Sequence, residues 1–292
     1  MTREPNFSGG ILMIVDTHLH IVDQDALSYP WLADAGPLNR NFSYDDYARE
    51  AKRLGIAASL HMEVDVAESD IDAETDNVAR IAARPGSLVV GAIANCRPEN
   101  PGFAALLERA REKQIIKGFR RVLHVMPDDL STSRLFRDNI KRLAGTGLTF
   151  DIVAKPHQLP IVQQLVDLAP DVQFVLDHCG VPDIKGGAYE PWAKNMTEMA
   201  KRPNVVGKLS GIVAYTDTQN WTLADIRPYA EHTISSFGFD RMVWGSDWPV
   251  CTLAGTLSAW VAATHALLEG ASKEEKAKLL SDNAIRLWNL KI

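Results

Sequence analysis

Histidine and acidic residues stand at three places where short apolar runs end. Residues 16–20 read Asp-Thr-His-Leu-His, so one residue separates His18 from His20. Residues two apart on a β-strand point to the same side, which lets both imidazoles reach one point. His178 follows a second apolar run, and Asp247 follows a third. Imidazole and carboxylate groups are zinc ligands, and a carboxylate can also act as the general base of a hydrolysis.

Side-chain parity predicts further polar residues at strand ends. In residues 57–64, the polar side chains of Ser59, His61 and Glu63 alternate with apolar ones. We expect the apolar face to meet helices, which turns His61 inward. Applied to the other runs, the same rule gives these inward candidates: Arg120 and His124, and Asp151 and Lys155. Cys179 has the opposite parity to His178, which argues against a thiol nucleophile at this strand end.

Short apolar runs alternate with longer amphipathic segments along the whole chain. The predicted strands are residues 12–20, 57–64, 88–95, 116–124, 149–155, 173–178, 204–210 and 241–247. The predicted helices are residues 44–54, 71–83, 103–113, 133–144, 159–168, 192–200 and 223–237, followed by 257–268 and 273–288. This alternation predicts a single α/β domain, a (β/α)₈ TIM barrel with an extra C-terminal helix. An open doubly wound sheet lacks support, because no glycine-rich nucleotide motif follows a strand.

Composition narrows the classes of function. The chain has 292 residues and a formal net charge of −6, which argues against a nucleic-acid surface. Its three cysteines are widely spaced and predict neither a disulfide framework nor a cysteine metal site. We find no secretory signal and no apolar run long enough for a membrane span. We therefore expect a cytoplasmic protein, with a flexible segment at residues 1–10 and a barrel domain at residues 11–292.

The motifs resemble those of the amidohydrolase superfamily, of the amidohydrolase-2 type. His18, His20 and His178, together with the Gly-Ser-Asp-Trp-Pro run at residues 245–249, match motifs of that superfamily. The Tyr-Pro-Trp-Leu run at residues 29–32 and the Lys-Leu-Ser-Gly run at residues 208–211 are similar to its sugar lactonase branch, which includes L-fuconolactonase and L-rhamnonolactonase. The resemblance implies a hydrolase that opens a cyclic ester, with the site at the carboxyl ends of the barrel strands.

The resemblance also implies roles for individual residues. Asp247 corresponds to the general base. The catalytic set is Asp247, His178 and Arg120, and the metal set is His18, His20 and Asp247, with His178 as a further ligand. The resemblance implies one divalent ion, with zinc favoured, or a site that works without metal. Strand four offers no inward lysine, which argues against a binuclear centre.

A small neutral lactone, of the aldonolactone kind, is the expected substrate. Its hydroxyl groups would suit mixed donors and acceptors, and an indole could cover its apolar face. The predicted binding residues are Trp31, His61, His124, Asp151 and Lys155. No nucleic-acid or membrane partner is expected, and the sequence leaves a homo-oligomer open.

Four alternatives remain open at this stage. The first is a metal-dependent decarboxylase of the same superfamily, which would use the same histidines and acid. The second is a lactone isomerase, and the third is a lactonase for pyrone dicarboxylates. The third would need several arginines to bind the two carboxylates of its substrate, and the candidates in the sequence are Arg97 and Arg120. The fourth is a binding barrel without catalysis, which the complete set of candidates disfavours.

Overall fold

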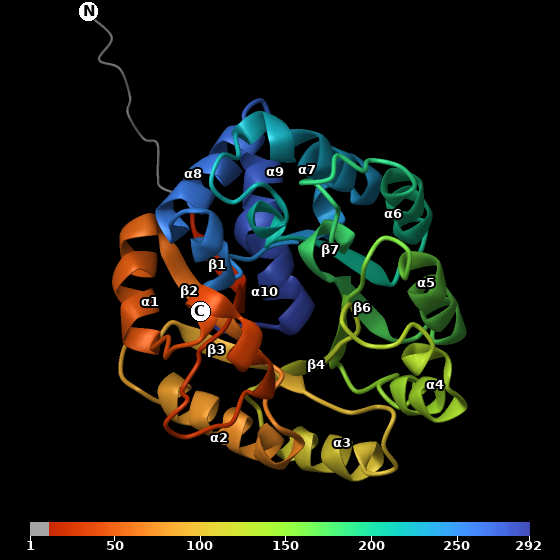
Figure 1. Ribbon diagram of the computed structural model, residues 1–292. Helices are drawn as coiled ribbons and strands as arrows, with labels where there is room; N and C mark the ends of the chain where they lie inside the picture. Colours follow the sequence, from red (N-terminus) through yellow and green to blue (C-terminus); the bar gives the residue numbers. More distant parts are fainter. Residues whose placement is uncertain (1–11) are drawn as a thin grey trace, which may run out of the picture.

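Eight parallel strands form a barrel in the computed structural model, which describes residues 12–292 (Figure 1). They are β1 (Ile14–Leu19), β2 (Ile56–Met62), β3 (Val89–Asn95), β4 (Ile116–Val122), β5 (Thr149–Val153), β6 (Gln173–Leu176), β7 (Val205–Leu209) and β8 (Met242–Trp244). Neighbours in sequence are neighbours in the sheet throughout. The predicted (β/α)₈ TIM barrel is therefore confirmed, whereas the segment predicted to be flexible, residues 1–10, lies outside the described residues.

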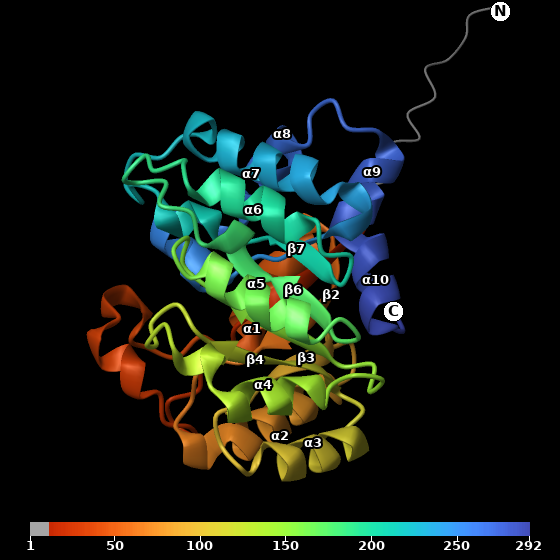
Figure 2. The same cartoon turned by 90° about the vertical axis from the view of Figure 1, so that its right-hand side faces the viewer.

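Helices surround the strands on the outside of the barrel (Figure 2). They are α1 (Tyr44–Ala51), α2 (Ile71–Ala82), α3 (Phe103–Glu112), α4 (Arg134–Lys141), α5 (Leu159–Leu168), α6 (Trp192–Ala200), α7 (Leu223–Phe237), α8 (Leu257–Leu267), α9 (Lys273–Ala277) and α10 (Asn283–Trp288). Ser43 and Ser133 cap α1 and α4, because each hydroxyl accepts a hydrogen bond from a backbone amide of the first turn. No helix within residues 12–292 is long and apolar enough to cross a membrane.

The last predicted helix is divided in the structure. A π-turn at Lys278–Asp282 separates α9 from α10. The hydroxyl of Ser281 donates a hydrogen bond to the carbonyl oxygen of Ala277 at 3.1 Å. Such bonds compete with the helical pattern and bend helices, and helical spacing in the sequence does not reveal them.

The barrel closes where the first strand meets the last. Leu19 and Trp248 form a parallel bridge just beyond β8. The amide of Asp247 donates to the carbonyl of His18 at 2.8 Å, and the amide of His20 donates to the carbonyl of Trp248 at 2.8 Å. These bonds join the two chain segments that carry the predicted metal ligands.

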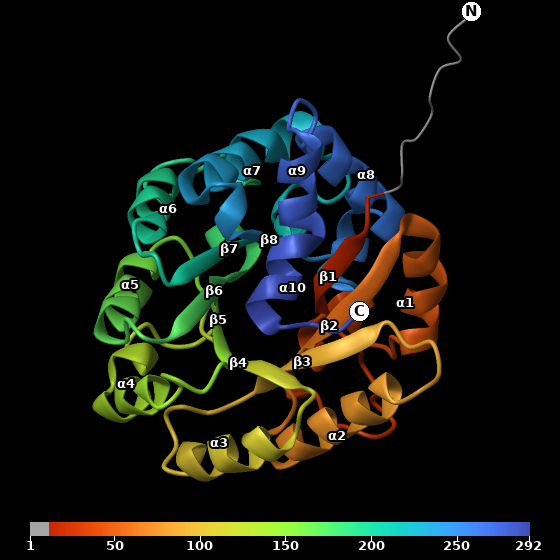
Figure 3. The ribbon, with the colours of Figure 1, turned by 180° about the vertical axis from the view of Figure 1, so that it is seen from behind.

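Helix α10 lies across one end of the barrel (Figure 3), and apolar side chains fill the interior there. A buried cluster inside the strands contains Val15, Leu60 and Val243 and includes Trp288 of α10. The indole nitrogen of Trp288 donates to the hydroxyl of Thr149 at 3.1 Å. In Figure 2 the loop between β1 and α1 lies at the end opposite α10. Polar side chains therefore gather at that second end, where the strands terminate.

Candidate active site

His18, His20 and Asp247 meet at the closing seam of the barrel. The Nε2 atom of His20 lies 3.4 Å from Oδ1 of Asp247, and Nε2 of His18 lies 3.6 Å from the same oxygen. All three side chains are buried. The pairing of β1 with β2 shifts register between Asp16 and Leu19, and this irregularity falls at His18. The structure thus brings together the three residues predicted to hold a metal.

The other ring nitrogens of the two histidines face groups that orient the rings. Nδ1 of His20 lies 2.9 Å from the carbonyl oxygen of Met62. Nδ1 of His18 lies 3.6 Å from Oδ1 of Asp177. Partners of this kind fix the tautomer so that Nε2 keeps its lone pair. Burial lowers the pKa of His20 to about 3 and that of His18 well below its usual value, so both rings are neutral and able to bind a cation.

The donor set fits one divalent ion of the zinc type. Tetrahedral zinc with nitrogen and oxygen ligands keeps those atoms about 3.3 Å from one another, close to the separations from Asp247 Oδ1. His18, His20 and Asp247 form one such group, and His18, Asp177 and His178 form a second. Glu63, Asp151 and Asp177 pair with the buried cations Arg120 and Lys208, whereas Asp247 faces the histidines.

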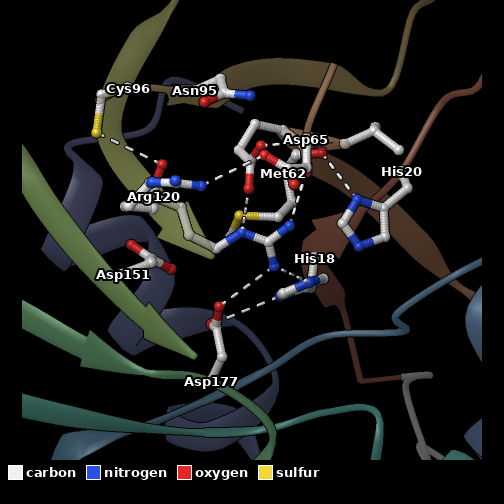
Figure 4. A network of polar contacts seen from close by, with 12 residues as sticks. His18, His20, Met62, Asp65, Asn95, Cys96, Arg120, Asp151 and Asp177 are labelled. Atoms are coloured by element: carbon white, nitrogen blue, oxygen red, sulfur yellow. Dashed lines mark hydrogen bonds and ion pairs between the residues drawn. The ribbon is translucent and has the colours of Figure 1, made fainter. Parts of the chain in front are cut away.

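Arg120 connects the histidines to two of these carboxylates. Its Nε donates to Oε1 of Glu63 at 2.6 Å, and its Nη2 donates to the carbonyl oxygen of Glu63 at 2.7 Å. Its Nη1 lies 3.3 Å from Nε2 of His18 and 3.6 Å from Asp177. Figure 4 shows the guanidinium of Arg120 with dashed lines to His18 and Asp177. The inward orientation predicted for Arg120 is confirmed, and its guanidinium is fixed by the groups around it.

Lys208, which the sequence suggested only as part of the Lys-Leu-Ser-Gly motif, lies buried in this cluster. Its ammonium lies 2.6 Å from Asp151 and 2.8 Å from Asp177. Burial alone would lower the pKa of Lys208, but the two carboxylates raise it. Asp177 in turn keeps a pKa well below its usual value, because Lys208 and His18 outweigh its burial. One signal in the sequence was available. Lys208 is a single lysine in an apolar run and has the same strand parity as Val206, which predicts that both side chains point to the same face.

His178 completes the cluster from a strained turn. Asp177–Gly180 forms a short helical turn in which His178 has a φ of 54°. Its Nδ1 lies 2.9 Å from the hydroxyl of Ser210 and 4.0 Å from Oδ2 of Asp247. A non-glycine residue with positive φ is uncommon, and such strain often accompanies function.

Asp247 carries a carboxyl group suited to proton transfer. Burial raises its pKa to about 6, although His178 and Arg120 pull the pKa down. Its Oδ1 faces His18 and His20, while Oδ2 faces His178. A base with a pKa near neutrality accepts and returns a proton most effectively.

A pocket of about 300 Å³ opens above this cluster. It is lined by His20, Val22, Trp31, Leu32, Leu38, Val64, Asp65, Arg120, Val122, His124, Val125, Val153, His178, Tyr215, Asp247, Pro249 and Val250. The indole of Trp31 donates to the carbonyl of Val64 at 2.8 Å, which fixes the ring at the mouth. Burial lowers the pKa of His124 to about 4, so this ring is neutral. Trp31 and His124 thus lie where a substrate would contact them.

Three predicted binding residues lie away from the pocket. The inward orientation predicted for His61 is wrong, because its ring lies 3.5 Å from Glu74 of α2, outside the strands. Leu60 and Met62 fill the interior instead, since the lower barrel is a packed apolar core. Asp151 points inward as predicted but is engaged by Lys208 below the pocket. Lys155 is exposed and does not line the pocket.

Comparisons with known proteins agree with this geometry. An amidohydrolase family model matches residues 15–290. The L-fucono-1,5-lactonase of Burkholderia ambifaria is 27% identical over 293 residues, which cover 94% of this chain and 95% of that protein. The 4-sulfomuconolactone hydrolase of Rhizobium radiobacter is 24% identical over 80% of this chain and 75% of its own length.

A solved structure is also similar. An amidohydrolase from Burkholderia multivorans, crystallised with bound zinc, superposes with a TM-score of 0.86 at 26% identity. The match covers 96% of this chain and 100% of that one. The superfamily and the lactonase branch expected from the sequence motifs are thereby confirmed. This chain belongs to the amidohydrolase family.

Proposed function

We propose that this chain hydrolyses a neutral, sugar-derived lactone to the open hydroxy acid. The observation that carries the proposal is the position of Asp247, a carboxylate that faces three imidazoles at the floor of the pocket. The relatives named as lactone hydrolases support the reaction class. A dicarboxylate substrate is disfavoured, because Arg120 is the sole arginine or lysine among the described pocket-lining residues and Glu63 already engages it.

The residues divide the work of ring opening among them. Asp247 takes a proton from water as the water oxygen bonds to the lactone carbonyl carbon. The ring carbon–oxygen bond then breaks, and the ring oxygen receives that proton from Asp247. Arg120 and His178 donate hydrogen bonds to the carbonyl oxygen as it gains negative charge.

His18, His20 and Asp247 would hold a divalent ion, and zinc suits this donor set. Such an ion, when bound, polarises a carbonyl and makes water more acidic. Asp177 and the carbonyl of Met62 keep the two imidazoles turned toward Asp247 whether or not an ion is present.

Proton release in weak buffer tests the reaction directly. The purified protein is mixed with 1,4- and 1,5-aldonolactones, before and after treatment with a chelator. We expect acid production that the chelator removes and added zinc restores. If no lactone releases acid, the proposed reaction fails, and an assay for carbon dioxide release tests the decarboxylase alternative.

The variant Asp247→Asn tests the assigned base. An amide accepts no proton from water, so we expect turnover to fall by at least about a hundredfold while the circular dichroism spectrum stays unchanged. The variant Asp138→Asn, on the exposed face of α4, serves as the control and should keep full activity. Near-normal activity of Asp247→Asn would contradict the mechanism.

A further inference from the structure

A carboxylate that takes no part in the proposed reaction lines the pocket. Asp65 follows the end of β2, and its side chain is 28% exposed. Its backbone has a φ of 46°, a conformation that non-glycine residues seldom adopt. Such a conformation persists only where neighbouring groups hold it, and it is frequent at ligand-binding positions.

Two arginines hold one oxygen of this carboxylate. Nη2 of Arg97 donates to Oδ1 of Asp65 at 3.0 Å, and Nη1 of Arg121 lies 3.6 Å from the same oxygen. Within residues 12–292, no hydrogen bond or ion pair reaches Oδ2 of Asp65. A carboxylate with one oxygen held and the other open can accept a hydrogen bond from a ligand without first having to be ordered.

Glu63 fixes the position of Asp65 relative to the groups that would act on the lactone carbonyl. Oε2 of Glu63 accepts a hydrogen bond from the amide of Asp65 at 2.7 Å. Oε1 of the same carboxylate accepts from Nε of Arg120 at 2.6 Å. One buried side chain therefore connects the floor of the pocket to Asp65, and it presets the spacing between the carbonyl and a hydrogen-bond acceptor on the pocket wall.

The charges around Asp65 favour a neutral ligand. Arg121 also donates to Glu99 at 2.8 Å. The two arginines thus face two acids, which leaves no excess positive charge to attract an anion. A carboxylate on the ligand would meet the open oxygen of Asp65 and be repelled, whereas a hydroxyl group can donate to it.

Two further polar side chains line the same pocket, His124 and Tyr215. Nδ1 of His124 is buried without a partner among the described residues. Burial lowers the pKa of His124 to about 4, so the neutral ring offers one donor and one acceptor. Burial raises the pKa of Tyr215 well above its usual value, so its hydroxyl group stays protonated. A ligand hydroxyl group would satisfy the unpaired nitrogen, which is otherwise costly to bury.

We propose that Asp65 is a specificity-determining residue whose Oδ2 accepts a hydrogen bond from a ring hydroxyl group of the lactone, with His124 and Tyr215 as partners for further hydroxyl groups. This inference rests on the proposed lactone hydrolysis and deepens it. The carbonyl faces Asp247 and Arg120, and the hydroxyl groups face these three side chains. Neutral polyhydroxylated lactones are therefore preferred over the same rings without hydroxyl groups.

Pairs of lactones with the same ring size measure this preference. D-Glucono-1,5-lactone is compared with δ-valerolactone, and D-galactono-1,4-lactone and L-mannono-1,4-lactone are compared with γ-butyrolactone. A hydrogen bond to a charged group is worth about tenfold or more, so the best aldonolactone should exceed its unsubstituted ring by at least about tenfold in kcat/KM. Equal or better turnover of the unsubstituted rings overturns the inference and leaves the lactonase function standing.

The variant Asp65→Asn tests the residue itself. Asparagine also adopts positive φ readily, so the backbone turn is kept. We expect the ratio of kcat/KM for the best aldonolactone over its unsubstituted ring to fall about tenfold. The loss should appear mainly as a higher KM for the aldonolactone, because the hydroxyl group is remote from the carbonyl. Equal losses for both lactones would show that Asp65 only supports the fold, which contradicts the assignment.

Two more variants complete this test. His124→Phe keeps a ring and removes both nitrogens, so it should lower the same ratio even if Asp65→Asn fails to fold. Asp128→Asn removes a carboxylate from the segment after β4, outside the pocket lining, and should leave the ratio unchanged. A ratio that is unchanged in His124→Phe as well as in Asp65→Asn overturns the inference.

Binding of lactams separates this inference from the proposed reaction. The lactams of the three aldonolactones and of the two unsubstituted rings resist hydrolysis, and calorimetry measures their affinities without turnover. Tighter binding of a polyhydroxylated lactam, lost in Asp65→Asn, supports the role of Asp65 even if no lactone is hydrolysed, in which case only the reaction has failed. Equal affinity for the hydroxylated and unsubstituted lactams overturns the inference.

Discussion

Asp177 contacts the side chains of His18, Arg120 and Lys208 and does not line the pocket. Its Oδ1 lies near both His18 and Lys208, while its Oδ2 lies near Arg120. A carboxylate behind a metal-binding histidine orients the ring and increases its basicity. Asp177 is therefore a positioning residue, whose effect reaches the site through His18.

This role predicts a loss of metal affinity in Asp177→Asn. An amide is a weaker partner for the Nδ1 proton of His18, so we expect zinc affinity to fall about 10- to 100-fold. Competition with a chromogenic chelator measures the affinity of protein whose fold has been checked by circular dichroism. Asp138→Asn, on the surface, should bind zinc as the unchanged chain does. Equal affinities in the two variants would show that Asp177 serves only the buried charge network.

Cysteine chemistry takes no part in this site. Cys179 is buried within the turn at Asp177–Gly180, and burial raises the pKa of its thiol to about 12. The thiol is therefore protonated at neutral pH and is a poor nucleophile. The parity argument from the sequence also disfavoured Cys179, but strand alternation does not apply there, because β6 ends at Leu176 and residues 177–180 form a turn.

At the scale of elements, the turn after β7 contains the glycine that lets His178 and Asp247 approach each other closely. Gly211 has a φ of 65°, and a Cβ atom there would overlap Nδ1 of His178 and lie 2.7 Å from Oδ2 of Asp247. Gly238, after α7, has a similar φ of 70° but has no atom within 4 Å of such a Cβ. The two glycines share a positive φ, but their ψ angles differ, −11° at Gly211 and 155° at Gly238, and so do their surroundings.

The pair Gly211→Ala and Gly238→Ala separates backbone strain from displacement of the site. Each variant should lose about 1–3 kcal/mol of unfolding free energy, since alanine is strained at both backbone conformations, and the conformation of Gly238 is the less accessible of the two to alanine. Only Gly211→Ala should lose activity, by at least about tenfold, because its methyl group displaces His178 or Asp247. Urea denaturation and kcat/KM give the two readouts. Comparable activity in both variants would mean that the turn tolerates the extra carbon.

The sequence predicted the elements better than it predicted their inner faces. All eight strands were located, because apolar runs with β-branched residues alternate clearly with amphipathic helices. The orientation of His61 was wrong, because parity alone does not say which face of a strand a barrel turns inward. The apolar pair Leu60 and Met62 belonged to the interior, where the lower layers of a barrel are packed.

Single side chains show the same limit. His18, His20, His178 and Asp247 were found because their types and spacing are informative. Lys208 was overlooked, because a lysine is usually exposed and its burial depends on two acids that stand far away in the sequence. Contacts of this kind follow from the closed fold and cannot be read from local spacing.

At the scale of the whole molecule, the C-terminal helix completes the barrel core. Trp288 is 3% exposed and packs among strand residues from both halves of the chain. Its replacement would leave a cavity in the end of the barrel opposite the site. Because Trp288 lies far from the proposed active site, its replacement should lower the unfolding free energy and leave kcat/KM unchanged.

Trp288→Ala should therefore lower the unfolding free energy by about 3–5 kcal/mol. Chemical denaturation followed by circular dichroism measures the change. Trp31→Ala removes an indole that is 39% exposed and should cost far less stability. If the two variants were equally stable, α10 would be a peripheral helix and no part of the core.

The closing seam gives the molecule a property that no single strand possesses. His18 and His20 come from the first strand, whereas Asp247 follows the last, and backbone bonds join the two segments there. Any species that bridges these side chains binds the closed barrel and has no comparable site in an open chain. Binding of such a species and closure of the barrel are thus thermodynamically linked. A chain whose seam is open has neither the assembled ligand set nor the base. The proposed ligand set and base therefore come together only when the seam is closed.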